Sequence, residues 1–122
     1  MLAKDKKTDL GVIKINDDVI AAVASVAALN VDGVQDMGGS PMDRILSKIK
    51  RGSGRGIKVI SMTENDLRLR VCILVKFGVN IPDVAFSVQE QVKDAIERML
   101  GIVVSEVDIQ IQGVTPNPKG GL

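Results

Sequence analysis

The chain of 122 residues contains no histidine, no tryptophan and no tyrosine, and its two phenylalanines are Phe77 and Phe86. Histidine is the commonest general base near neutral pH, so its absence removes the side chain that enzymes use most often for proton transfer. A lone cysteine, Cys72, cannot supply the nitrogen and sulfur ligands of a structural zinc site. These absences exclude most of the usual catalytic and zinc-binding arrangements.

Cys72 also leaves the chain without an internal disulfide, so no such bond stabilises the protein for an oxidising compartment. The residue lies in the middle of a predicted strand among arginines and apolar residues, with no base beside it in the sequence. Free cysteine usually packs as a small hydrophobe. We therefore interpret Cys72 as a structural thiol and not as a nucleophile.

The carboxylates and glycines form no recognisable ligand-binding motif. Acidic pairs such as Asp17 and Asp18 are explained by a helix start, by turns or by an exposed strand, and no calcium loop occurs. The glycines of "RGSGRG" (51–56) follow a predicted helix and open a predicted strand, which is the reverse of a phosphate-binding loop. We expect no enzyme activity, no cofactor and no metal.

Long apolar runs are missing too. No stretch approaches the ~20 apolar residues that span a bilayer, and "MLAKDKKTDLG" at the amino terminus has no apolar run of signal-peptide length. The 16 basic and 15 acidic residues nearly balance, which argues against an overall polyanion binder. We expect a cytoplasmic protein, or one attached to the inner face of the membrane through a partner.

The residues that are present predict one domain over 10–115, with a flexible arm over 1–9 and a flexible tail over 116–122. Alternating apolar residues predict strands, and apolar residues at helical spacing predict helices. The predicted strands are 10–15, 34–37, 57–62, 67–77 and 105–114, and the predicted helices are 17–29, 41–50 and 82–100. The fold class is α+β: a two-layer sandwich with two main helices on one face of a mixed sheet of about four strands, plus a short helical insert.

The helix faces and ends follow from the same pattern. We expect Asn16 and Asn80 to cap the two main helices and Gly101 to end the second. The inward stripe of the first helix is predicted to contain Val19, Ile20, Val23, Val26 and Ala27. The inward stripe of the second is predicted to contain Val84, Val88, Val92, Ala95, Ile96 and Met99.

Two surfaces are candidates for contacts with other molecules. In the strand 67–77 alternate residues face the helices, which leaves the other residues on an open sheet face. We expect that face to present Lys58, Ile60, Arg68, Arg70, Leu74 and Gln110. Phe86 falls on the outward side of the second helix, where it is either covered by its own chain, simply exposed, or part of an intermolecular contact.

A basic segment over 44–58 favours a different class of function. Its candidate patch consists of Arg44, Lys48, Lys50, Arg51 and Arg55, followed by Lys58. Such a patch suits phosphates of nucleic acid or of anionic lipid. However, the open sheet face has none of the aromatic residues on which RNA-binding sheets stack bases, so we do not favour nucleic acid as a partner.

Three separated blocks resemble the alkaline shock protein family of bacterial envelope stress response proteins. They are "LGVIKINDDVIAAVASVAALNVDGV", "FGVNIPDVAFSVQEQVKDAI" and "VDIQIQGV", and the most specific part is "GVNIP" at 78–82. The resemblance covers residues 10–115. It implies a small cytoplasmic protein, found mostly in Gram-positive bacteria, that is linked to cell-envelope homeostasis and alkaline stress and can associate with the membrane through an anchored partner.

Composition and resemblance together predict a non-enzymatic interaction module. Its expected partner is a protein, either a membrane-anchored one or a second copy of the chain. The alternative is a nucleic-acid or anionic-lipid binding module that uses the basic segment. Phosphate binding weakens steeply with salt and an apolar protein contact does not, so salt dependence separates the two.

Overall fold

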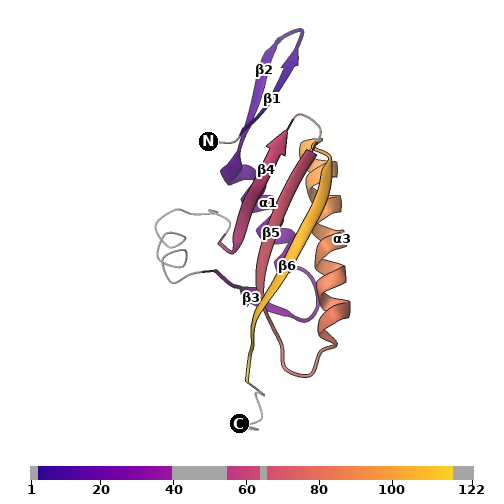
Figure 1. Cartoon of the computed structure of the whole chain (residues 1–122). Coiled ribbons are helices and arrows are strands. Elements are labelled where there is room, and N and C mark those ends of the chain that lie inside the picture. The colour runs from indigo at the N-terminus through magenta and orange to yellow at the C-terminus, as the bar shows by residue number, and fades with distance from the viewer. Residues whose placement is uncertain (1–2, 40–54, 64–65, 117–122) are drawn as a thin grey trace.

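The structure is a computed structural model that describes residues 3–39, 55–63 and 66–116. Its strands are β1 (Ala3–Thr8), β2 (Gly11–Asn16), β3 (Val34–Met37), β4 (Ile57–Thr63), β5 (Asp66–Val75) and β6 (Val104–Val114), and its helices are α1 (Asp17–Leu29) and α3 (Ile81–Leu100). The expected α+β sandwich is confirmed: α1 and α3 lie on one face of a four-stranded sheet (Figure 1). The expected helix over 41–50 lies outside the described residues.

β5 is the central strand of the sheet. Along one side it pairs antiparallel with both β3 and β4, and along the other side it pairs parallel with β6. Parallel strands need a long crossover, and α3 is that connection between β5 and β6. The sheet is therefore mixed, as expected, and β6 forms one complete edge of it (Figure 1).

The core lies between β5 and the two helices. The β5 residues that face the helices are fully buried, namely Leu67, Leu69, Val71, Ile73 and Val75. Burial of one such side chain contributes about 1.5–3 kcal/mol. The intervening residues, Arg68, Arg70, Cys72 and Leu74, are more exposed and occupy the opposite face. The predicted alternation of β5 is confirmed.

The prediction of a flexible arm over 1–9 is wrong. Ala3–Thr8 is a strand, β1, that pairs antiparallel with β2 from Ala3 opposite Asn16 to Thr8 opposite Gly11. This hairpin stands apart from the main sheet (Figure 1), so the strand expected over 10–15 exists but belongs to a separate two-stranded sheet. Solvent reaches both faces of such a hairpin, and the β1 sequence "AKDKKT" lacks the apolar alternation by which strands are predicted.

The inward stripe expected for α1 is wrong in part. The helix buries Ile20, Ala21, Ala24 and Ala28, whereas Val19 is 44% and Val26 is 60% exposed. Alanine lets the helix backbone approach the sheet closely, so small residues face the core. In α3 the expected stripe is correct from Val84 to Ile96 but wrong at Met99, which is 62% exposed.

The expected helix ends are largely correct. Asn80 caps α3, since its side-chain oxygen accepts a hydrogen bond from the Asp83 backbone N–H at 3.1 Å. Gly101 ends that helix in the left-handed conformation at φ 68°. Asn16 occupies the N-cap position of α1, but its side chain makes no capping hydrogen bond.

Candidate interaction surfaces

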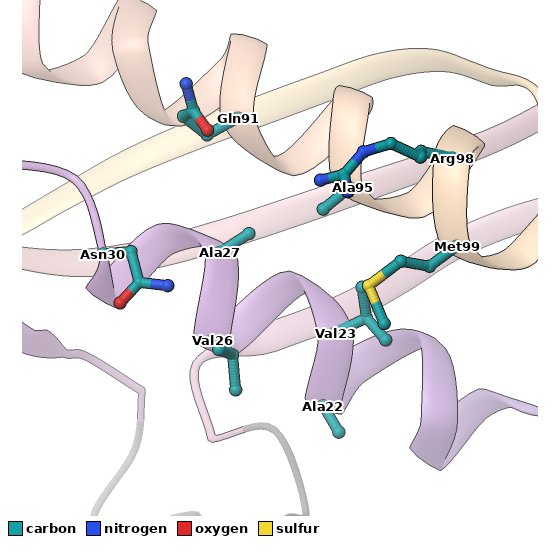
Figure 2. A pocket seen from close by; sticks show the side chains of 9 residues that line it. All are labelled: Ala22, Val23, Val26, Ala27, Asn30, Gln91, Ala95, Arg98 and Met99. Carbon is teal, nitrogen blue, oxygen red and sulfur yellow. The ribbon is translucent and has the colours of Figure 1, made fainter.

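A groove with a largely apolar lining lies between α1 and α3. We call it the α1–α3 groove. It has a volume of about 350 Å³ and is lined by Ala22, Val23, Val26, Ala27, Asn30, Gln91, Ala95, Arg98 and Met99. Figure 2 shows Ala27 of α1 and Ala95 and Met99 of α3 pointing toward the other helix, whereas Ala22 and Val26 point from α1 away from α3. The two helices therefore build the site together.

The floor of the groove follows from the packing of the helices. The buried side of α1 is occupied by Ala21, Ala24 and Ala28. Val23 and Val26 therefore lie toward α3 or toward solvent. On α3, Ala95 is small and Met99 extends into the groove. The flexible thioether of Met99 therefore forms part of the groove wall and can adapt to a bound group. A contiguous apolar surface results, although no single residue in it is unusual.

The rim of the groove is polar. Asn30 and Gln91 lie at one end, and Arg98 lies near Met99. The Arg98 guanidinium is 3.4 Å from the Asp94 carboxylate, but both side chains are about two-thirds exposed. An exposed pair of this kind contributes about 0–1 kcal/mol, so Arg98 remains available to an external carboxylate.

The residues predicted for the open sheet face lie on β4, β5 and β6, on the side of the sheet away from the helices. Lys58 is opposite Arg70, which is opposite Asp108, and Cys72 is opposite Gln110. Ile60, which is 40% exposed, lies at a bulge of β4. Leu74 is opposite Gly113 near the end of the same strand. The predicted residues Lys58, Arg68, Arg70, Leu74 and Gln110 thus share one face of three adjacent strands.

Charges of both signs alternate across this face. Arg68 lies 3.5 Å from Asp66 and 4.0 Å from Glu106, and Arg70 lies beside Asp108 in the register. The Cys72 thiol donates a hydrogen bond to the Gln110 side-chain oxygen at 3.5 Å. A face neutralised in this way has no strong attraction for a polyanion.

Phe86 lies on the flank of α3 that faces β6. It is 60% exposed and lines a shallow hollow with Gln89, Lys93 and the β6 residues from Val104 to Val107. The outward position predicted for Phe86 is confirmed, and within the described residues its own chain leaves more than half of it uncovered. What the sequence does not show is that Phe86 lies next to the edge of the sheet.

Three side chains of α3 bind the backbone of β6. Gln89 Nε2 donates to the Val107 carbonyl at 2.9 Å, and Lys93 Nζ donates to the Val104 carbonyl at 2.8 Å. Glu97 Oε2 accepts from the Val104 N–H at 3.0 Å and from Lys93 Nζ at 2.6 Å. The hydrogen bond from Lys93, and then that from the Val104 N–H, lower the pKa of the Glu97 carboxyl. We call these three residues the α3 clasp.

The basic patch lies mostly outside the described residues, which include neither Arg44, Lys48, Lys50 nor Arg51. Arg55 is described, and its guanidinium lies 2.6 Å from the Asp36 carboxylate. It also donates a hydrogen bond to the Met37 carbonyl at 3.4 Å. Arg55 is thus used to hold the start of β4 against β3. Lys58, which follows the patch in the sequence, is exposed to solvent.

Groups of metal-binding side chains are not found in the residues that the structure describes. No group of three or more acidic or cysteine side chains is placed to hold a metal ion there. Across the same residues, no helix is long and apolar enough to cross a membrane. The α1–α3 groove and the hollow beside Phe86 are two of the concave surfaces that the described residues form.

The fold and its surfaces define a small two-layer α+β domain with a groove between its helices. The chain belongs to the alkaline shock protein 23 family, described as having a cell envelope-related function, whose model matches residues 5–116. The predicted family resemblance is therefore confirmed, and the match includes β1 residues that we had assigned to an arm.

Relatives in Gram-positive bacteria are similar over most of their length. The uncharacterized protein YqhY of Bacillus subtilis is 35% identical over 113 residues, which is 92% of this chain and 83% of that protein. The uncharacterized protein YloU of the same organism is 33% identical over 111 residues, or 88% of this chain and 92% of that protein. Spy1535 of Streptococcus pyogenes, also uncharacterized, is 28% identical over 115 residues, covering 89% and 86%. No solved structure matches the chain.

Proposed function

We propose that this protein is a non-enzymatic interaction module that serves the cell envelope by docking on a membrane-anchored protein and by self-association. The observation that carries the proposal is the α1–α3 groove, in which Val26 and Met99 are exposed by 60% and 62%. The family's cell envelope-related function supports an envelope protein as the partner.

The groove suits an apolar segment of a protein partner. Its walls are two helices, and a helix that lays an apolar face between two others is a common mode of peptide recognition. Val23, Val26 and Met99 would provide the apolar contacts, and the alanines would let the partner's backbone approach closely. Arg98 at the rim favours an acidic residue at the edge of the docked segment.

The proposal is tested by placing a charge in the groove. The full chain carrying Val26→Asp is produced in native cells, and the fraction of protein that sediments with membranes is measured. Val26 is exposed in the free chain, so we expect the variant to fold. We expect its membrane-bound fraction to fall about ten-fold or more, because burying an unpaired carboxylate costs well over the ~1.4 kcal/mol that this factor represents.

Val103→Asp is the matched control. Val103 is 55% exposed and does not line the groove. It should leave the membrane-bound fraction unchanged. If Val26→Asp and Val103→Asp both sediment like the wild type, or if the wild type itself does not sediment with membranes, the groove does not bind an envelope partner.

A further inference from the structure

β6 is an edge strand, and its register with β5 identifies the backbone groups that point away from the sheet. Leu67 N–H donates to the Val103 carbonyl, and Thr115 N–H donates to the Val75 carbonyl. In a parallel pair, a residue of β5 therefore bonds the two residues that flank its partner on β6. The partners themselves, Val104, Val107, Ile109, Ile111 and Val114, direct their N–H and C=O groups outward.

The backbone N–H and C=O groups that point outward from β6 are hydrogen-bonded by α3 side chains near the start of the strand, but not farther along it. The α3 clasp takes up the N–H and C=O of Val104 and the C=O of Val107. Ile109 and Ile111 have no hydrogen bond on their outer side from any residue that the structure describes. A row of unpaired backbone groups on an edge strand is a template for another strand.

The uncapped part of the edge also lacks the side chains that usually prevent such pairing. Proteins protect edges with charges, proline or bulges. The segment "IQIQGV" (109–114) contains neither a charge nor a proline, and its bulge lies beyond Ile111. On the opposite side of the sheet, β4 has Lys58 and a bulge between Val59 and Ser61.

We infer that Ile109 and Ile111 of β6 pair antiparallel with the same two residues of a second copy of this chain. The two-fold axis passes beside Gln110. Ile109 of each copy then exchanges both backbone hydrogen bonds with Ile111 of the other, so every uncapped outward group at these two positions is satisfied. Two sheets become one continuous sheet with a self-complementary contact.

Side chains favour a second copy as the occupant. On the open sheet face Gln110 meets Gln110 of the second copy, and Asp108 lies opposite Gln112 of the second copy. The Gln112 side chain extends across the sheet toward the end of β3, where its oxygen accepts from the Gly39 N–H at 2.7 Å. No like charges oppose one another in this register, so charge does not hinder self-pairing.

The helix side of the contact is apolar. Ile109 and Ile111 are partly buried there against the core, and each would cover the other across the interface. Val114 points to the same side, because it is paired with the buried Val75, and it is 48% exposed. In the proposed register Val114 of the second copy lies next to Val107 and so beside Phe86. The contact therefore covers two exposed apolar residues that the monomer leaves in water.

This inference names the interface for the self-association in the proposed function, yet it stands apart from the groove. The groove is lined by Gln91, Ala95 and Arg98 of α3, whereas the clasp and Phe86 occupy the opposite flank of that helix. Val26→Asp should therefore leave the dimer intact. A failure of one claim can be told from a failure of the other.

The test is a pair of opposite charges at the two-fold axis. Full-length Gln110→Lys and Gln110→Glu are prepared separately, and their dimer dissociation constants are measured by sedimentation against the wild type. Each variant alone should dimerise about ten-fold more weakly, because like charges then face each other and the amide pair is lost. An equimolar mixture of the two variants should recover dimers.

Gln35→Lys is the matched control, since Gln35 is an exposed glutamine of β3, which pairs with the other side of β5 from β6. It should dimerise like the wild type. Recovery in the mixture shows that the single variants are folded. If Gln110→Lys dimerises like the wild type, or if the wild type stays monomeric up to about 1 mM, the inference is wrong.

Hydrogen exchange gives a second readout on the wild-type chain. The amides of Ile109 and Ile111 should exchange rapidly in dilute protein and become protected as its concentration rises, because only the second copy supplies their acceptors. Protection at every concentration in a monomeric protein would show that another part of the same chain covers the edge. That result would also overturn the inference.

Discussion

At the scale of single residues, Gly56 illustrates how tightly β4 is joined to β5. Its φ of +83° is one that side chains disfavour, and a Cβ atom at this position would lie 2.8 Å from the Cys72 carbonyl oxygen. The Gly56 carbonyl in turn accepts a hydrogen bond from the Cys72 N–H at 2.8 Å. The backbone of the two segments is therefore in direct contact, and no side chain fits between them.

Gly56→Ala should destabilise the fold through both strain and contact. Gly78→Ala is the matched comparison, because Gly78 has a φ of +96° but nothing within 4 Å of an added Cβ. We expect a loss of about 1–2 kcal/mol for Gly78→Ala from the backbone conformation alone. Gly56→Ala should lose about 1–3 kcal/mol more. Urea unfolding measures both, and equal losses would contradict the close approach.

At the scale of secondary-structure elements, the α3 clasp ties the second helix to the edge of the sheet. Glu97 is its charged member, and its pKa lies below the ordinary value of 4.5 because of Lys93 and the Val104 N–H. The unfolded chain thus takes up a proton at Glu97 at a higher pH than the folded chain does. The clasp stabilises the fold fully above pH 4.5, and this contribution is lost as the pH falls through the lower folded pKa.

Glu97→Gln should remove that dependence on pH. The free energy of unfolding of the variant should lie below that of the wild type near neutral pH, and the difference should shrink below pH 4.5. Unfolding by urea over a series of pH values measures it. Glu90→Gln, on an exposed position of the same helix, should show no such convergence. A difference that grows toward acid pH would contradict the assigned role of Glu97.

At the scale of the whole molecule, the sequence predicts the features that depend on one element and misses those that depend on two. The strict alternation of β5 and the caps at Asn80 and Gly101 could be predicted because each is a local pattern. The open sheet face and the outward side of Phe86 follow from the same periodicity. These are the parts of the fold and of the candidate surfaces that needed no knowledge of neighbouring elements.

The α1–α3 groove could not be predicted, because it depends on how far α1 lies from the sheet. Hydrophobicity ranks Val26 above Ala24 as a core residue, but the close approach of the helix leaves room only for alanine. Met99 is apolar and in phase with the core, yet it lies near the end of α3 beside the groove. A run of alanines at 21, 24 and 28 is the signal that could have indicated the correct phase.

We propose that this protein acts by contact and not by chemistry. Because the family resemblance implies a link to alkaline stress, the most direct measurement is growth at alkaline pH of cells that lack their own copy and carry the wild type, Val26→Asp or Cys72→Ser. Serine keeps a donor for Gln110 but removes the chain's lone thiol. We predict that Cys72→Ser restores growth as the wild type does and that Val26→Asp does not. Restoration by Val26→Asp together with failure of Cys72→Ser would contradict the account.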